Sequence, residues 1–580
     1  MFSKFMRLIA ATVIAATAIS LGGCSSSSGL KPGTEISIGE LQGLESLNPD
    51  VASSSKAQGQ NADLGLLTSA SFYTPNDAGD LVANTDFGTV KLVSKFPFTV
   101  SYSLTGAAVW SDGTKVDATD LLLSWLAASH SEKFGFDSVR ANSGLRFATA
   151  IPKLSTDLKT LTVQYTRPVT DWRNTIYPAV AAHTLAQKAF PSDKLDARAA
   201  KSRFVQDVNT SNDTDLAELG RQYVAAYSLA KGAKDPTKFL VGAGPYLVES
   251  ADAVEGVKLR ANDKFTWGNL PLIEIINVRY YEDSLAMIAD IQLGKLDLGS
   301  TVESGSAQTQ QIGGVAKKAG LNLALGLSQN IDAIRLNLAA GSIFSKASGN
   351  ADKAAQLRQA FMLAVPKARI VAAINNDYSV QNAQSFFYAP GAIGYTSTVK
   401  DNHSSSFAFQ DLEAASEILV SAGATQPIVV RVLFDSTNPR QNLIWNELSK
   451  FSKQIGFEFV DAKQVAQTAR ISDGDYDVSI TQQALFSVSN FASLETVSTE
   501  YFASESFTSL VKKLAVTNKP ARQHALAAQL DSALFAEGYG LPLYQVPTML
   551  AYSTKVTGVS LSPFGNSAFW SYWNWQKAAK

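Results

Sequence analysis

The stretch Val109-Trp110-Ser111-Asp112-Gly113, followed by Asp117-Ala118-Thr119-Asp120-Leu121, contains the clearest structural signal in the chain. Its Asp-Gly dipeptide marks a turn, and this turn positions the large side chain of Trp110 for burial. Asp117 fits the N-cap of a helix, and Asp120 places a carboxylate in the first turn, near the positive end of the helix dipole. The stretch therefore predicts a tight turn that leads directly into a helix.

Strand signals lie on both sides of this stretch. Residues 98–104 and 161–165 alternate apolar with polar side chains, which is the pattern of a half-buried strand. Residues 428–434 form an apolar, β-rich run that suits a buried strand. Because such strands alternate with helix signals, we expect two large α/β regions, one on each side of residues 300–330.

Helices and loops are indicated between these strands. One helix is predicted by Ile444, Leu448, Phe451 and Ile455 on one face before Gly456, and a second by Leu357, Phe361 and Ala364 before Pro366. Turn-forming residues predict loops at three places, namely residues 209–215, 341–352 and 395–406.

Length and composition narrow the class of protein. The 580 residues allow two to four domains at about 100–200 residues each. The hydrophobic fraction of 46% and charged fraction of 17% are those of a globular chain. A net charge of -1 argues against nucleic acid or anionic lipid as the main partner. One cysteine and four histidines are too few for a cysteine-rich zinc site or a thiol redox pair.

The lone cysteine follows an export signal. Lys4 and Arg7 precede an apolar run, Leu8–Leu21, which is too short to span a membrane comfortably. Leu21-Gly22-Gly23-Cys24 resembles the bacterial lipobox, so residues 1–23 are predicted to be a lipoprotein signal peptide and Cys24 the lipidated residue. Residues 24–33, rich in serine, are expected to be a flexible tether. The alternative is an ordinary signal peptide with a chance cysteine.

Signals for catalysis are weak. Ser509-Leu510-Val511-Lys512 fits S-x-x-K, but its S-D-N and K-T-G companions are missing, and no G-x-S-x-G occurs. Asp473, Asp475 and Asp477 alternate as in a calcium loop, but Val478 stands where the loop needs glycine. The histidines are far apart in sequence: His130, His183, His403 and His524. We therefore predict no catalytic residue, no metal site and no cofactor.

Several motifs together resemble those of family 5 extracellular solute-binding proteins, the peptide-, dipeptide- and nickel-binding components of ABC importers. The opening stretch is similar to the family's W-S-D-G…T-A-x-D-V. Gly242–Tyr246 resembles G-T-G-P-Y, Asn262–Gly268 resembles N-x-x-Y-W, and Leu47-Asn48-Pro49 resembles L-D-P. Further similar segments follow in family order: Ile288–Asp297, Asn337, Arg358–Ala360, Gly474–Asp477 and Leu541–Tyr544.

The resemblance implies a two-lobed, α/β, periplasmic-binding-protein-like fold (class II, cluster C type) with an extra inserted domain. Hinge closure would enclose a ligand between the two lobes. The implied division is domain I at 34–70, 236–325 and 530–580, domain II, the insertion, at 71–235, and domain III, the second lobe, at 326–529. The implied protein is a non-enzymatic monomer, anchored through Cys24 on the extracytoplasmic face, that serves the permease and separate ATPase of an importer.

One departure from the family pattern bears on the ligand. In peptide-binding members a W-x-x-D segment follows D-Y-D, and its aspartate pairs with the peptide's α-amino group. Here Gln483 stands at the tryptophan position and Phe486 at the aspartate. A phenyl ring cannot balance an ammonium group, so this route to a free peptide N-terminus is not expected. Nickel capture has no histidine cluster to support it.

The favoured ligand is an oligopeptide or peptide-like compound, held by backbone hydrogen bonds and aromatic pockets. The candidate contacts are Ser53, Ser54, Phe386, Phe387, Tyr388, Gln482, Gln483 and Phe486. An oligosaccharide is the alternative, because amides and aromatic rings suit sugars equally well. A tethered secreted hydrolase and a lipoprotein with an adhesive or signalling role are further alternatives. Each candidate contact can instead be a core residue.

Overall fold

The computed structural model describes residues 29–577 apart from short gaps. The gaps are residues 42, 52–57, 76–80, 170, 231–236, 238–239, 302–312, 346–349, 376–379, 393, 425–426, 451–455, 466–473, 487–493, 495–496, 498–503, 518 and 562–566. The signal peptide and Cys24 lie outside the described residues, as does half of the tether, residues 24–28. Across the described ranges, no helix is both long and apolar enough to cross a bilayer.

Helices and strands alternate along the chain. The helices are α1 (Gln58–Thr68), α2 (Ala118–Ser129), α3 (Ser131–Phe134), α4 (Ala182–Ala189), α5 (Ala197–Thr210), α6 (Asp213–Ala225), α7 (Ser284–Gln292), α9 (Ala351–Ala364), α10 (Lys367–Asn375), α11 (Tyr395–Asp401), α12 (Leu412–Ser421), α13 (Pro439–Ser449), α14 (Ala462–Val465), α16 (Glu505–Ala515) and α17 (Pro520–Ala536). The strands are β1 (Lys31–Glu40), β2 (Tyr73–Pro75), β3 (Leu81–Ala83), β4 (Gly88–Lys95), β5 (Phe98–Leu104), β6 (Lys153–Leu154), β7 (Thr160–Tyr165), β8 (Tyr246–Asp252), β9 (Gly256–Ala261), β10 (Ile273–Tyr280), β11 (Leu298–Thr301), β12 (Asn322–Leu336), β13 (Ile428–Leu433), β14 (Phe457–Asp461), β15 (Val478–Ala484) and β16 (Gly540–Tyr552).

Most of these strands join one long mixed sheet, in the order β14-β13-β15-β12-β16-β11-β1-β10-β9-β8. The sheet contains both parallel pairs, such as β1 with β10 and β13 with β14, and antiparallel pairs, such as β12 with β16. A smaller antiparallel sheet has the order β4-β5-β7-β6. The α/β class predicted from the sequence is confirmed.

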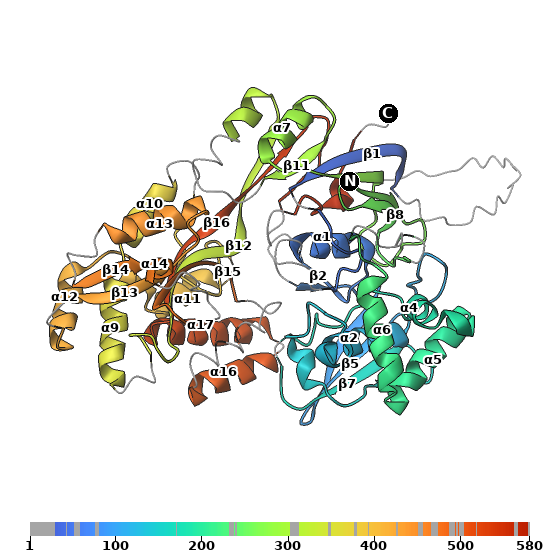
Figure 1. The fold of residues 1–580 in the computed structure, drawn as a ribbon, viewed down its shortest axis with the longest axis horizontal. Coiled ribbons are helices and arrows are strands. Elements are labelled where there is room, and N and C mark those ends of the chain that lie inside the picture. Colours follow the sequence, from blue (N-terminus) through green and yellow to red (C-terminus); the bar gives the residue numbers. More distant parts are fainter. Residues whose placement is uncertain are drawn as a thin grey trace, which may run out of the picture.

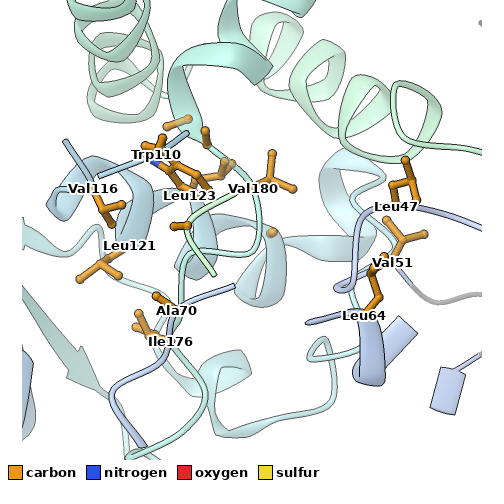
Figure 2. Close-up of a cluster of buried hydrophobic side chains, with 14 of the residues drawn as sticks. Leu47, Val51, Leu64, Ala70, Trp110, Val116, Leu121, Leu123, Ile176 and Val180 are labelled. Atoms are coloured by element: carbon orange, nitrogen blue, oxygen red, sulfur yellow. The ribbon is translucent and has the colours of Figure 1, made fainter. Parts of the chain in front are cut away.

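The described residues form two large hydrophobic clusters, which define two lobes (Figure 1). The first lobe contains residues from Ile36 to Leu298 together with a C-terminal segment, Leu550–Trp575. Figure 2 shows part of its core, with Trp110, Leu121 and Val180 buried together. The second lobe contains residues from Ile331 to Tyr544. The small sheet and α2 to α6 share the first lobe's core, so the segment expected as an insertion packs continuously with its neighbours.

The opening stretch folds as predicted. Gly113 has a positive φ of 91°, which suits the turn residue, and Trp110 is buried. Asp117 caps α2 by accepting from the Thr119 amide at 2.9 Å, and Asp120 completes a capping box by accepting from the Asp117 amide at 3.0 Å. Because Asp120 also accepts from the indole Nε1 of Trp110 at 3.2 Å, one carboxylate fixes both the turn and the helix.

The other expected elements have mixed outcomes. The predicted strands match β5, β7 and β13, and the predicted helices match α9 and α13, although Phe451 and Ile455 lie outside the described residues. The loop expected at residues 395–406 is wrong, because α11 occupies much of it and packs beside α17. The loop expected at 209–215 shortens to Ser211 and Asn212, since Asn212 caps α6. Turn-forming residues here mark helix ends rather than loops.

Two strands, β12 and β16, run from one lobe to the other (Figure 1). Their antiparallel pairing shifts register between Leu327, opposite Pro547, and Ile331, opposite Gln545. Three residues of β12 therefore face one residue of β16, which forms a bulge where the strands pass between the clusters. The Nε2 of Gln545 donates to the Ser328 carbonyl at 2.6 Å, and this hydrogen bond stabilises the bulge.

Candidate functional site

A cavity of about 500 Å³ opens in the first lobe, beside the end of α1. Chain segments from eight parts of the sequence meet there, from Pro49 to Trp573. Aromatic side chains form much of its wall: Tyr73, Tyr177, Phe265, Trp267, Trp570, Tyr572 and Trp573. Its size is that of a small-molecule site, and aromatic walls with a few polar groups are typical of such sites.

One wall of the cavity is built around Trp267. Its indole Nε1 donates to the Ala243 carbonyl at 2.9 Å, and the Phe265 ring packs edge-on against it at 5.1 Å. A Cβ on Gly268 would lie 2.8 Å from the Phe265 ring, so only glycine allows this close approach. The Nδ2 of Asn84 donates to the carbonyls of Ser71, at 3.0 Å, and Trp267, at 3.1 Å. Asn84 thereby ties two lining segments together.

Another part of the wall comes from the C-terminal segment. Tyr572 donates its hydroxyl to the Asn269 carbonyl at 2.9 Å, and burial raises the pKa of this phenol, which keeps it a donor. The Trp573 ring stands nearly perpendicular to Tyr572, with centroids 5.0 Å apart, and 5.8 Å from Trp570. Trp570 and Tyr572 are buried, whereas Trp573 is half-buried. Trp573 is therefore the indole with a face available to a bound molecule.

A buried ion pair between Asp50 and Arg140 lies next to the lining residues Pro49 and Val139. Asp50 follows Pro49, which lines the cavity, and accepts from Nε and Nη2 of Arg140, each at 2.6 Å. Ser138 and Tyr223 donate to the same carboxylate at 2.9 and 2.7 Å. This bidentate, fully bonded arrangement anchors the chain just before residues 52–57. The predicted contacts Ser53 and Ser54 fall in that gap and lie outside the described residues.

The second lobe brings three predicted contacts together. Phe387 and Phe486 pack with centroids 5.4 Å apart, and the Phe486 amide donates to the Phe386 carbonyl at 2.8 Å. All three rings belong to the lobe's buried core, and Phe386 has 0% exposure. Phe386 also packs on Tyr539 at 5.1 Å. In this arrangement a solute reaches these rings only if the surrounding core opens.

The loop that carries these rings is held by a buried carboxylate. Asp531 accepts from the Phe386 amide at 2.9 Å and from the Nδ2 of Asn402 at 2.8 Å. Burial raises the pKa of Asp531 to about 6, against the hydrogen bonds that lower it. Tyr388, the fourth aromatic candidate, is half-buried and stacks on His524 at 5.4 Å.

The two predicted glutamines lie at the carboxyl end of β15. Gln482 accepts from Nη2 of Arg440 at 2.7 Å, and the Nε of Arg440 donates to Asp332 at 2.8 Å. Tyr544 also donates to Asp332, at 2.5 Å. The Oε1 of Gln483 is buried and accepts no hydrogen bond from the described residues. Both glutamines are half-buried, so their amides border the strand ends where α/β lobes bind ligands.

The residues considered for catalysis or metal binding are dispersed. Ser509 and Lys512 lie on α16, and Asp477 accepts from the Nε of Arg431 at 2.9 Å, which makes it a structural anchor. Asp473 lies outside the described residues. Within the described ranges, no three histidine, cysteine, aspartate or glutamate side chains gather as metal ligands.

The ligand contacts predicted from the sequence lie mainly in the second lobe, and those that the structure describes do not line the first-lobe cavity. The run Phe569-Trp570-Ser571-Tyr572-Trp573-Asn574-Trp575 was the available signal, because it concentrates aromatic side chains near the C-terminus. Its partners Trp267 and Tyr73 are distant in sequence, so only the fold brings them together.

The sequence is similar to one protein-family model and to several curated bacterial proteins. A family model described as "Bacterial extracellular solute-binding proteins, family 5 Middle" matches residues 93–503. An uncharacterized lipoprotein of Mycobacterium leprae is 25% identical over 550 residues, 92% of this chain and 91% of that protein. The oligopeptide-binding protein OppA of Mycobacterium tuberculosis is 21% identical over 530 residues, 85% of this chain and 77% of that protein.

A solved structure has the same fold. The periplasmic EDTA-binding protein EppA matches with a TM-score of 0.71 and 18% identity, over 95% of this chain and 98% of that chain. This likeness confirms the predicted two-lobed fold of the periplasmic-binding-protein type.

Proposed function

Because the chain belongs to family 5 of the bacterial extracellular solute-binding proteins, we propose that it captures a peptide or peptide-like solute between its lobes and delivers it to an ABC importer. The observation that carries the proposal is the passage of β12 and β16 between two separate cores, with a bulge at the crossing. Two strands with a local irregularity form a hinge about which the lobes can close. Closure would bury the solute and shift the population toward the closed state.

We propose the domain division implied by the sequence, with one adjustment. A boundary after residue 529 would cut α17, which runs unbroken from Pro520 to Ala536 and contributes Leu530 and Leu534 to the second core. We therefore place the return to the first lobe within β16, near Val546 opposite the bulge. The tether also shortens, because β1 begins at Lys31.

The ligand is assigned as a peptide or peptide-like compound, and an oligosaccharide is the alternative. A relative named as an oligopeptide-binding protein supports the first assignment. Phe486 packs on Phe387, so this position offers an ammonium group no counter-charge. N-acetylated and free peptides of one sequence should therefore bind equally. A preference above about 1.4 kcal/mol for the free amine, which is tenfold, would assign that role to another acid.

We propose that Cys24 carries a diacylglyceryl thioether that holds the protein at the extracytoplasmic face of the cell membrane. Curated relatives that bear the name lipoprotein support this assignment. Fatty-acid labelling of the wild type should be lost in Cys24→Ser. Equal labelling of the two would remove the anchor from the proposal.

The function is tested by uptake and binding together. Deleting the gene should abolish uptake of one solute class, and the purified protein should bind that class without converting it. A casein digest and a mixed oligosaccharide pool, each added to ligand-stripped protein, separate the two ligand assignments by the rise in melting temperature. Turnover in a hydrolase screen would contradict a binding role, because family 5 members are binders.

A further inference from the structure

The first-lobe cavity differs from other hollows of the lobe in its charge. Among the described residues that line it, none is an aspartate, glutamate, lysine, arginine or histidine. Its polar side chains are neutral and include Asn84, Asn174 and Asn269. By contrast, a hollow on the exposed face of β8 to β10 is lined by charged side chains, among them Glu35, Asp252, Glu255, Lys258 and Arg279.

Charges just behind the cavity wall are already engaged. The carboxylate of Asp50 accepts two hydrogen bonds from Arg140 and further ones from Ser138 and Tyr223. The guanidinium of Arg173 lies 4.2 Å from the centroid of the Trp172 ring and hydrogen-bonds to Tyr73. A charged solute group that entered the cavity would lose its hydration and would have to take a partner from one of these pairs.

The aromatic wall suits a ligand group that presents a flat, apolar face. The rings of Trp570 and Trp573 meet at 67°, and those of Tyr572 and Trp573 at 86°. Trp573 is half-buried, whereas Trp570 and Tyr572 are buried, so part of its indole stays accessible for stacking. Asn269 lies exposed at the rim, where its amide can both donate and accept a hydrogen bond.

We propose that this cavity holds an uncharged, ring-bearing part of the transported solute, stacked against Trp573 within the aromatic wall. An aromatic side chain of a peptide and a sugar ring share this chemistry. The inference rests on the proposed solute-binding function and narrows it, because it assigns a neutral ring to the first lobe and leaves the rest of the solute to the second.

The test uses the purified protein and small probes of matched shape. N-acetyltryptophan amide is neutral, N-acetyltryptophan carries a carboxylate and tryptamine carries an ammonium group; methyl β-cellobioside is the neutral sugar. Saturation-transfer NMR and calorimetry should show that a neutral probe binds at least tenfold more tightly than either charged probe. Binding of the amide assigns an aromatic side chain, and binding of the cellobioside assigns a sugar. Equal or tighter binding of a charged probe, or binding of no probe, would overturn the proposal.

Substitutions at single residues test whether the neutral probe binds in the first-lobe cavity. Trp573→Ala should weaken binding of the neutral probe at least tenfold, whereas Trp445→Ala should not, because Trp445 is also half-buried but lies in the second lobe against Phe434. If Trp573→Ala does not fold, Asn269→Asp places a carboxylate at the exposed rim and should turn the preference toward tryptamine. Unchanged preference in Asn269→Asp, or equal losses in the two tryptophan variants, would overturn the assignment.

Failure of this inference is distinguishable from failure of the proposed function. A protein that binds a casein digest or an oligosaccharide pool, but none of the neutral probes in this cavity, remains a solute-binding protein whose cavity has another role. A protein that binds neither pool fails the broader proposal.

Discussion

The indole Nε1 of Trp172 donates a hydrogen bond of 2.9 Å to the carbonyl oxygen of Ala515, 343 residues further along the chain. Trp172 belongs to the first core, and Ala515 ends α16 of the second lobe. Val516, the C-cap residue, packs against the first core as well. The lobes therefore touch at a place away from the β12–β16 crossing. Because Asn174 lines the cavity two residues after Trp172, this contact lies close to the candidate site.

Trp172→Phe should loosen the contact between the lobes. Phenylalanine keeps an apolar ring at the position but removes the donor to Ala515, and a hydrogen bond of this kind stabilises by about 1 kcal/mol. If the contact stabilises the closed arrangement, solute affinity should fall about fivefold, measured by calorimetry. Trp445→Phe is the matched control, since its indole makes no cross-lobe bond among the described residues. Equal affinities for the wild type and Trp172→Phe would show that this contact does not stabilise the closed arrangement.

Asp50→Asn should destabilise the first lobe strongly. Asparagine keeps the shape of the side chain but leaves the guanidinium of Arg140 buried without its counter-charge, which typically costs about 3–5 kcal/mol. Urea unfolding followed by tryptophan fluorescence measures the loss. Glu218→Gln breaks the exposed pair with Arg221 and should leave the midpoint unchanged. A loss in Asp50→Asn no larger than in this control would contradict the role of the pair.

The buried amine of Lys367 makes the free energy of unfolding depend on pH. Its Nζ donates to the Ala383 carbonyl at 2.6 Å, and burial lowers its pKa to about 7. In the unfolded chain the lysine keeps its proton up to about pH 10.4. Between about pH 7 and about pH 10.4 the amine is therefore protonated in the unfolded state and neutral in the folded state. Stability therefore rises with pH across this window, and the cost of burying the charged amine is complete below pH 7.

Lys367→Met removes this titration. From pH 7 to 9.5 the wild type should gain about 3 kcal/mol relative to Lys367→Met, measured from urea unfolding at each pH. Lys400→Met, at an exposed position of α11, is the control and should show no such change. Parallel stability curves for the wild type and Lys367→Met would show that this amine does not titrate between the folded and unfolded states.

Local sequence patterns predicted much of the fold. The turn at Gly113, the cap at Asp117 and the strands around residues 98–104 and 428–433 depend on neighbouring residues, so they can be derived without tertiary information. Helix α11 could not be derived in this way. Its segment, Tyr395–Asp401, leads into the turn-forming run at residues 401–406 and forms a helix where it packs beside α17.

The candidate site was harder to predict for a related reason. Phe386 and Phe486 have the residue type of a ligand contact, but the sequence does not reveal that both rings face a core. The cavity needs Trp267 beside Tyr572, some 300 residues apart, and this proximity follows from the return of the chain through β16. Composition reveals aromatic groups, whereas the fold decides which of them line a cavity.

Closure of the lobes around a solute is the central claim, and a distance between the lobes tests it most directly. Cys24→Ser removes the native cysteine, so spin labels can be placed at exposed Val93 on β4 and exposed Lys512 on α16. Pulsed electron spin resonance should give a broad distribution for ligand-stripped protein. Saturation with the solute pool that raises the melting temperature should narrow it to one shorter distance. An unchanged distribution at saturation would contradict closure and, with it, the proposed mechanism.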